Sequence, residues 1–535
     1  MTCAPTTIAA DAGGESERDL GGDLRGIEST AAESVSIGDS LAVGMMSSAV
    51  LMGLQKSLGL VRHLLFLTWL TQDQMGRFSL AQNFAMTFIP LIQLGIPASL
   101  CRYAESFRRQ GQLRSYLRRV GWACFLLAAP VSAFGVVCPE SLAVLIYRDS
   151  EAVPLVRLLA IVFFLVAGAN LVHELLLAHR LFRVASSIQM AGTAVFLTSG
   201  TLLMLLTSMR DCAVLIAYGL SNATIMLGGL WCFRPYYRGS RDHGMPLSLP
   251  LFWKRIIGYS LAHCVSASLS GMYFYVANRS LLCLDGVAPA EAEGLVGQLA
   301  SGVFIPMQLM QFIGGFSGTT LFPYLSRDWE SGRKAEVCRQ FYTALKLVTL
   351  IYCAAALMVL VASPLLFDGL LRGRYNSGRE VLSWALALYA WMNILYFTQI
   401  FVWCAERPWR VAWAMVPGVL VQWLAGLWLV PALGLHGTVL ALILGHLVTV
   451  ALLLYFCHGY GLPADRSLLI TLLIPFAFLF DSGCTAWLIL LAGISLFHTD
   501  WILGRAERVV CLDRIRALAA RGAALLHRRS TLPTR

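Results

Sequence analysis

Three basic side chains stand inside stretches of sequence that are otherwise apolar. Lys56 and Arg62 belong to "LQKSLGLVRHLL", and Arg279 follows Asn278 in "FYVANRSLL". A guanidinium binds phosphate oxygens through two parallel hydrogen bonds and keeps its charge at any relevant pH. These residue types therefore predict a site for an anionic group such as a phosphate. The alternative is that both arginines lie near the ends of helices and extend to lipid headgroups.

The composition indicates what surrounds these charges. The chain has 535 residues, of which 57% are hydrophobic and 13% are charged, and its mean hydropathy is +0.68. Soluble globular proteins carry about 25% charged residues, so the chain is predicted to be a polytopic membrane protein. The net charge of +11 is spread over loops and the C-terminal tail. A positive-inside bias accounts for this charge, which therefore does not indicate nucleic-acid binding.

Apolar segments of about 20 residues, the length that crosses a bilayer as a helix, recur along the chain. We predict an all-α fold in which fourteen such segments span the membrane. They lie at about 40–69, 78–101, 118–146, 154–178, 183–207, 211–232, 254–282, 294–321, 338–366, 381–404, 409–431, 436–457, 467–481 and 484–503. The first is long and the thirteenth is short, so twelve spans with a re-entrant or interfacial tail are an alternative.

Lysine and arginine collect in the loops on one side of the predicted membrane, which the positive-inside rule assigns to the cytoplasm. The loop after the second span, "CRYAESFRRQGQLRSYLRR", alone holds six arginines. This orientation places both ends of the chain in the cytoplasm. Residues 1–38 are small, polar and acidic, and are predicted to form a disordered lead without a signal peptide. Residues 504–535 are predicted to form a basic cytoplasmic tail.

Two parts of the chain repeat one another in order. "FIPLIQ" begins at Phe88 and "FIPMQL" at Phe304, 216 positions later, and "AHRLFRVA" at Ala178 recurs as "AERPWRVA" at Ala405, 227 positions later. Loop insertions between two diverged copies produce a slowly growing offset of this kind. The alternative is a chance match, because apolar sequences align easily with one another. Each copy holds six spans, an even number. The copies therefore enter the membrane in the same sense and are predicted to form two six-helix lobes side by side.

The repeat sets the predicted domain boundaries. The first lobe covers 39–232, a cytoplasmic linker 233–253, the second lobe 254–458, and two additional helices 459–503. Repeat transporters bind their substrates between the halves near the midplane and rock one half against the other. Arg62 and Arg279 are 217 positions apart, close to the offset of the "FIP" pair. We therefore expect them on opposite walls of a central cleft, with Lys56 beside them.

Four segments resemble a known family. They are "LTWLTQDQMGRFSLAQNFAMTFIPLIQLGIPASLCRYAE" at Leu67, "NRSLLCLDGVAPAEAEGLVGQLASGVFIP" at Asn278, "LFPYLSR" at Leu321 and "LVPALGLHGTVLALILGHLV" at Leu429. Over about 40–460 the chain resembles the polysaccharide-exporter branch of the multidrug/oligosaccharidyl-lipid/polysaccharide (MOP) exporter superfamily. The resemblance implies twelve to fourteen spans in two six-helix lobes. It also implies flipping of a polyprenyl-pyrophosphate-linked sugar from the cytoplasmic to the outer leaflet.

Under this interpretation the predicted substrate-binding residues form two groups. The first group, which would hold the pyrophosphate, is Lys56, Arg62, Asn278 and Arg279. Amides on the second and eighth spans would meet the sugar or, alternatively, bond to neighbouring helices: Gln82, Gln93, Gln308 and Gln311. Pro90 and Pro306 occupy matching places in the same two spans and are predicted to act as hinges or as plain kinks. The family often has Asp-Arg where this chain has Asn278-Arg279, which removes one candidate for binding a coupling ion.

Other functions are kept as alternatives. Multidrug or small-molecule efflux by a related exporter needs carboxylates in the membrane, of which Glu174 is the clearest here. A membrane enzyme acting on lipid-linked glycans would place general acids and bases on a large outer loop, and the predicted outer loops are short. A third possibility is a scaffold protein that has lost transport.

The chain shows no nucleotide-binding motif, and its 14 cysteines have no zinc spacing, so we expect no cofactor and no metal. The sequence therefore predicts a non-enzymatic flippase of a lipid-linked glycan in a bacterial cytoplasmic membrane. Its expected partners are this substrate, membrane lipids, and a glycan polymerase or ligase.

Overall fold

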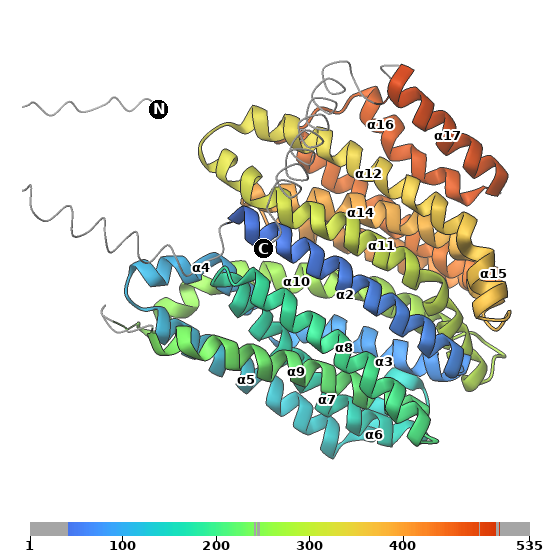
Figure 1. Cartoon of the computed structure of the whole chain (residues 1–535), viewed down its shortest axis with the longest axis horizontal. Coiled ribbons are helices and arrows are strands. Elements are labelled where there is room, and N and C mark those ends of the chain that lie inside the picture. Colours follow the sequence, from blue (N-terminus) through green and yellow to red (C-terminus); the bar gives the residue numbers. More distant parts are fainter. Residues whose placement is uncertain (1–40, 240–241, 243–246, 481, 499–501, 503–535) are drawn as a thin grey trace, which may run out of the picture.

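The computed structural model describes residues 41–239, 242, 247–480, 482–498 and 502. Within these ranges every regular element is a helix, as the composition predicts (Figure 1). The predicted cytosolic lead, 1–38, and the predicted basic tail, 504–535, lie outside the described residues.

The first half of the chain folds into eight helices connected by short turns. They are α2 (Leu41–Trp69), α3 (Gln72–Ile92), α4 (Ala98–Arg109), α5 (Leu113–Val137), α6 (Pro139–Tyr147), α7 (Val153–Ala178), α8 (Phe182–Leu206) and α9 (Arg210–Gly239), with a 3-10 turn, η1 (Ser150–Ala152), before α7. Each predicted span of this half corresponds to one long helix. The short helices α4 and α6 occupy ends of segments that the sequence assigned to longer spans.

The second half repeats this pattern with longer helices. It comprises α10 (Leu249–Leu282), α11 (Pro289–Glu330), α12 (Lys334–Pro364), the π-helical turn η2 (Leu365–Leu370), α13 (Asn376–Glu380), α14 (Leu382–Cys404), α15 (Trp409–His458), α16 (Arg466–Leu473), the 3-10 turn η3 (Ile474–Leu479) and α17 (Ser482–His498). α15 is broken at Gly434, whose φ of 56° and ψ of −125° are not helical. The two parts of α15 therefore match the two spans predicted at about 409–431 and 436–457.

In the described part of the chain, nine helices are long and apolar enough to cross a membrane, or ten if the bent pair α3–α4 is one span. This number is below fourteen partly because α15 contains two predicted spans. The chain is thus a multi-pass membrane protein, and the exact number of spans stays a prediction.

Helix packing divides the molecule into two bundles. α7 and α8 pack on α9, α5 packs on α7, and α2 packs on α8; in the second bundle α10 and α14 pack on α15, and α11 packs on α12 and α14. Figure 1 shows α5, α7 and α9 in the lower part of the molecule and α12, α14 and α17 in the upper part. α3 packs against α10 and α11 and joins the two bundles, which we call the first and second lobes.

Turns at matching places of the two lobes agree with the predicted repeat. Gly111 and Gly332, with φ of 64° and 82°, follow helices that end in the same pattern of hydrogen bonds. The Gln112 N–H donates to the Phe107 carbonyl at 2.9 Å, and the N–H of Arg333 donates to the carbonyl five residues before it at 3.0 Å. A left-handed residue after the last helical turn satisfies carbonyls in this way, and glycine adopts it without strain.

The two ends of the bundle differ in charge. At one end lie the arginine-rich turn after α4, which includes Arg108 and Arg109, and the end of α9; we call it the basic face. The start of α3, the start of α11 and the loop before α7 lie at the opposite end, which we call the acidic face because Asp149, Asp211 and Glu293 meet there.

The last helices attach to the second lobe through a capped turn. Asp465 precedes α16, and its carboxylate accepts hydrogen bonds from the Leu468 N–H at 2.9 Å and from the Tyr342 hydroxyl of α12 at 2.5 Å. Partial burial acts to raise the pKa of Asp465, but these hydrogen bonds outweigh it and hold the pKa below its usual value. The carboxylate therefore links α16 to α12.

A sharp bend follows Pro90. α3 and the helical segment from Ile96 to Arg109 meet at 66°, and the Gly95 N–H donates to the Pro90 carbonyl at 3.0 Å. Gly95 has φ of 63°, and a Cβ on it would lie 2.1 Å from the Ser260 carbonyl oxygen of α10. Pro306, at the matching place, lies within α11, which continues as one helix to Glu330. The bend is thus found in the first lobe and not at the equivalent place in the second.

Replacing Gly95 with alanine is expected to destabilise the folded protein by about 2–6 kcal/mol. The new Cβ meets backbone of α10 and sits on a left-handed residue, and each effect costs about 1–3 kcal/mol. The melting temperature of the purified protein in detergent measures the loss. Gly121→Ala is the control, because Gly121 lies inside α5 and a Cβ there has no atom within 4 Å. An unchanged melting temperature for Gly95→Ala would contradict the prediction.

Candidate functional site

Lys56 connects the two lobes inside the membrane. Its ammonium donates a hydrogen bond to the side-chain oxygen of Gln311, so α2 of the first lobe is joined to α11 of the second. About two turns further along α2, the ring of His63 stacks on Phe304 of α11, with ring centroids 3.4 Å apart and an angle of 7° between the ring planes. The structure therefore brings together Lys56 and Gln311, two of the predicted site residues.

Arg62 points into the first lobe. Its guanidinium carbon lies 4.1 Å from the centre of the Phe196 ring of α8, a distance at which a cation is attracted to the face of an aromatic ring. Among the residues that the structure describes, neither Lys56 nor Arg62 forms an ion pair with a carboxylate. Two half-buried positive charges on one helix are thus left without a balancing negative charge, which suits an anionic ligand.

Arg279 lies in the last turn of α10, at the acidic face. It donates to the Leu145 carbonyl of α6 at 3.0 Å, and Arg148, which follows α6, donates in return to the Leu282 carbonyl of α10 at 2.7 Å. The two lobes are therefore joined by reciprocal arginine–carbonyl bonds. Arg279 and Arg62 share no partner in the described structure, so their placement on opposite walls of one cleft stays a prediction.

The remaining predicted residues have different surroundings. Asn278 is buried beside Arg279, and its side-chain nitrogen has no partner among the described residues. The amide nitrogen of Gln93 donates to the Ala167 carbonyl of α7 at 3.2 Å, an interhelical bond. Gln82 lies close to the Tyr218 hydroxyl, and the buried side-chain oxygen of Gln308 has no described partner. Gln93 thus fits the alternative of interhelical bonding.

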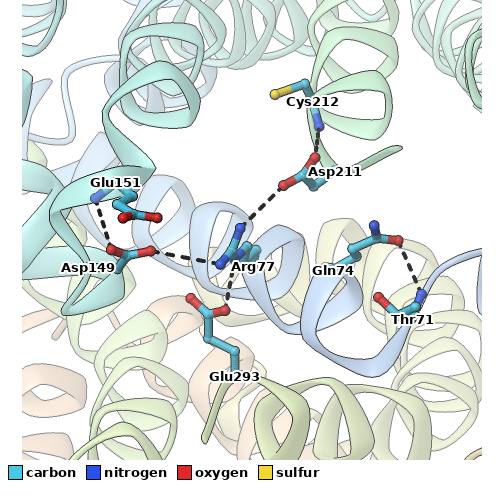
Figure 2. A network of polar contacts seen from close by, with 8 residues as sticks. All are labelled: Thr71, Gln74, Arg77, Asp149, Glu151, Asp211, Cys212 and Glu293. Carbon is cyan, nitrogen blue, oxygen red and sulfur yellow. Dashed lines mark hydrogen bonds and ion pairs between the residues drawn. The ribbon is translucent and has the colours of Figure 1, made fainter. Parts of the chain in front are cut away.

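An ionic cluster at the acidic face joins four segments of the chain. The Arg77 guanidinium of α3 contacts Glu293 of α11 at 2.8 Å, Asp211 of α9 at 3.6 Å and Asp149 before η1 at 3.8 Å. Figure 2 shows Arg77 between these three carboxylates. The Glu293 side chain is 1% exposed, so its charge depends on this arginine. The cluster fixes the first lobe against the second at this end.

The backbones of α3 and α11 touch beside this cluster. A Cβ on Gly76 would lie 1.9 Å from the Glu293 carbonyl oxygen, and a Cβ on Gly297 would lie 1.9 Å from the Gln72 carbonyl oxygen. Only glycine allows two helices to approach this closely. The side chains of Gln298 and Gln72 are hydrogen-bonded at 2.8 Å across the same contact.

The turn after η2 adds further bonds between the lobes at the acidic face. Arg374 donates to the Thr68 carbonyl at 2.8 Å, and the Tyr375 hydroxyl donates to the Leu70 carbonyl at 3.3 Å. Together with the ionic cluster, these bonds close the molecule at the acidic face.

At the basic face the lobes meet through buried packing of Phe252 and Ile256 of α10 on Phe107 and through an exposed ion pair. Arg102 of α4 pairs with Glu406, which follows α14, at 3.3 Å, and their side chains are 43% and 62% exposed. An exposed ion pair stabilises by about 0–1 kcal/mol, much less than a buried one. The structure therefore holds the lobes more firmly at the acidic face than through this pair.

The ionic cluster was not predicted from the sequence. The predicted second span began at 78, so Arg77 counted as a flanking residue, and the three carboxylates fell in short loops or at helix starts. A signal was present, because Arg77 and Glu293 are 216 positions apart, the offset of the "FIP" pair. Applying that offset to every charged residue would have paired them.

Comparisons with known proteins agree with this architecture. Residues 41–329, more than half of the chain, match the family described as polysaccharide biosynthesis protein. No curated protein matches the chain significantly.

Solved structures of low sequence identity share the fold. The lipid II flippase MurJ in its inward closed conformation is 13% identical, with 84% of this chain and 98% of that chain covered and a TM-score of 0.62. A multidrug resistance MATE family transporter of the MOP superfamily, inward-facing, is 14% identical, with 77% and 94% covered and a TM-score of 0.60. A MOP superfamily transporter from Pyrococcus furiosus is 13% identical, with 78% and 95% covered and a TM-score of 0.61.

Proposed function

The chain belongs to the polysaccharide biosynthesis protein family, and from this premise we propose that it flips a lipid-linked glycan. The substrate is an oligosaccharide or polysaccharide unit carried on a polyprenyl pyrophosphate. It moves from the inner to the outer leaflet of a bacterial cytoplasmic membrane. The family match carries the proposal, and the uncompensated charges of Lys56 and Arg62 support it from the site.

The charged residues suggest how the substrate is held. Lys56 and Arg62 bind the pyrophosphate through charge-assisted hydrogen bonds, and Gln311, which already meets Lys56, completes this end of the site. Asn278, Arg279, Gln82 and Gln308 are further polar groups toward which the headgroup moves. No covalent bond is formed or broken, so the protein acts as a transporter and not as an enzyme.

The contacts between lobes suggest the direction of opening. The acidic face is closed by a buried ion pair and by helix backbones in contact. Basic loops face the cytoplasm in most membrane proteins, so the described state corresponds to one that is closed toward the outside. Rocking the lobes 39–232 and 254–458 against each other then gives alternating access.

Partners follow from the substrate. A glycosyltransferase pathway on the cytoplasmic side has to supply the lipid-linked unit, and a polymerase or ligase on the outer side has to consume it. Both ends of the chain are placed in the cytoplasm by the same charge rule.

Depletion of the protein is expected to raise the cellular pool of one polyprenyl-linked saccharide, because its removal from the inner leaflet stops. Mass spectrometry of extracted lipids, before depletion and after restoring the wild-type chain, measures this pool. Arg109→Ala is the control variant and should lower the pool as the wild-type chain does, because the Arg109 side chain is 81% exposed on the basic face. The measurement is made in a strain without a second flippase. If no such lipid accumulates there, flipping is contradicted and multidrug or small-molecule efflux becomes the better interpretation.

A further inference from the structure

A cavity of about 250 Å³ lies between the lobes at the basic face. It is formed by α4 of the first lobe, by α10 and α11, and by the turn from α14 to α15. Five aromatic side chains line it: Tyr103, Tyr259, Phe322, Trp403 and Trp409. We call it the aromatic cleft. Its volume is close to the lower limit of known small-molecule sites, about 300 Å³.

Two of the aromatic side chains that line the cleft are partly exposed. Phe322 is 37% exposed and Trp409 is 41% exposed, although both are large apolar residues. The ring of a pyranose has an apolar face of C–H bonds, which packs on an aromatic ring, and an edge of hydroxyl groups, which needs polar partners. Stacking on π-systems supplies binding energy to such a face beyond the area that it buries.

Polar partners stand in the same cleft. Arg102 and Glu406 line it, and their contact at 3.3 Å leaves much of both side chains exposed. The Arg102 guanidinium also lies 5.3 Å from the centre of the Tyr259 ring, which fixes its position. A guanidinium offers five N–H donors and a carboxylate only acceptors. The pair therefore provides both kinds of partner that sugar hydroxyl groups require.

A membrane-interface belt would explain these aromatic residues differently, because Trp and Tyr gather at both surfaces of a bilayer. The belt is represented on α15 by Trp413 and Trp428, which are 69% and 81% exposed. Trp403 and Tyr259 are less exposed than these and line a cavity between the lobes. Their position favours a binding site over a lipid belt.

The distance to the charged site fits one ligand. Phe322 is eleven residues beyond Gln311 on α11, which is roughly 16 Å along a helix. A pyrophosphate at Lys56 and Gln311 would place the first sugars of an attached glycan along this path toward the basic face.

We propose that the aromatic cleft binds the saccharide part of the lipid-linked glycan before it is flipped. This proposal rests on the proposed function and adds where the sugar is recognised. The cleft makes the protein prefer a polyprenyl pyrophosphate that carries sugar over one that does not.

Gly258 allows the cleft to be filled without disturbing the helix. It lines the cleft from α10, and a Cβ added to it has no atom within 4 Å. Gly258→Leu therefore places a side chain into the cavity, and Trp403→Ala/Trp409→Ala removes two stacking surfaces. Gly121→Leu and Trp413→Ala are the matched controls, because Gly121 also has open space around it and Trp413 lies on the outside of α15.

The experiment measures binding of two lipids to the purified full chain by native mass spectrometry. One lipid is the glycan lipid isolated from depleted cells, and the other is undecaprenyl pyrophosphate without sugar. We expect the wild type and both controls to bind the glycan lipid about tenfold more tightly than the sugar-free lipid. Both cleft variants are expected to reduce this preference to less than about twofold, with unchanged binding of the sugar-free lipid.

Three outcomes would overturn the proposal. The wild type could bind both lipids equally, the cleft variants could keep the preference, or they could lose affinity for both lipids alike, as a structural defect would cause. The depletion experiment tests the proposed function separately, because depleted cells would accumulate no glycan lipid if that function were wrong.

Discussion

Replacing Arg77 with alanine is expected to open the acidic face and to shift the equilibrium between closed and open states there by about 100-fold. The substitution leaves Glu293, which is 1% exposed, without its arginine, and leaves Asp211 and Asp149 facing it. Breaking a buried ion pair by removing one partner costs about 3–5 kcal/mol, and about 2.7 kcal/mol already corresponds to a factor of 100. Transport slows because the closed state is an obligatory part of each cycle.

Labelling of a cysteine placed at the contact measures this opening. Gln298 is half-buried and bonded to Gln72 across the lobes, so Gln298→Cys should react slowly with a membrane-impermeant thiol reagent and faster when Arg77→Ala is added. The exposed native cysteines are replaced beforehand, so that the reagent labels only the introduced cysteine.

Two controls make this prediction specific. Arg109→Ala also removes an arginine, but from an exposed pair with Glu105 at 3.6 Å, and should change nothing. Exchanging the charges in Arg77→Glu/Glu293→Arg should recover part of the closed state, because one arginine and one glutamate still meet. Equal labelling rates in Arg77→Ala and wild type would show that the cluster does not hold the acidic face closed.

The double substitution Lys56→Ala/Arg62→Ala is expected to abolish rescue of depleted cells, with a fall in transport of about 100-fold or more. Both side chains carry a positive charge within the membrane and have no described carboxylate partner. A hydrogen bond to a charged group contributes about 1.5–3 kcal/mol, so two of them account for a loss of this size. The polyprenyl-linked saccharide pool, measured by mass spectrometry, should stay as high as in depleted cells.

Conservative and distant variants separate charge from structure. Lys56→Arg/Arg62→Lys keeps both charges and should retain more activity than the alanine double variant, but less than the wild type, because lysine cannot form two parallel hydrogen bonds to phosphate. Arg279→Ala tests the sequence prediction that a second arginine faces the same ligand; a loss equal to that of Arg62→Ala would support it. Full rescue by Lys56→Ala/Arg62→Ala would place the phosphate site elsewhere.

The helices could be predicted because the bilayer imposes one rule on all of them. A chain in hydrocarbon has to satisfy its backbone within each segment, so about 20 apolar residues become a helix whatever packs around them. Even the break in α15 was predicted, since the gap between the spans at 409–431 and 436–457 contains Gly434.

Side-chain partners could not be predicted in this way. A membrane helix is apolar on the face toward lipid and on the face toward its neighbours, so hydropathy does not reveal its rotation. The sequence predicted a central cleft for Arg62 but did not reveal its contact with Phe196 of its own lobe. The bend after Pro90, and its absence at Pro306, likewise depends on packing against α10 and not on the proline alone.

The pair Arg77–Glu293 bears on the history of the chain. Its members are 216 positions apart, so they occupy equivalent places in the two copies and meet where the copies face each other. Two identical subunits would bring arginine against arginine or glutamate against glutamate at this place, and either would repel. The contact therefore requires that the two copies had diverged at this place. The two halves are consequently complementary. A chain made of either half twice would lack the ion pair that holds the acidic face closed.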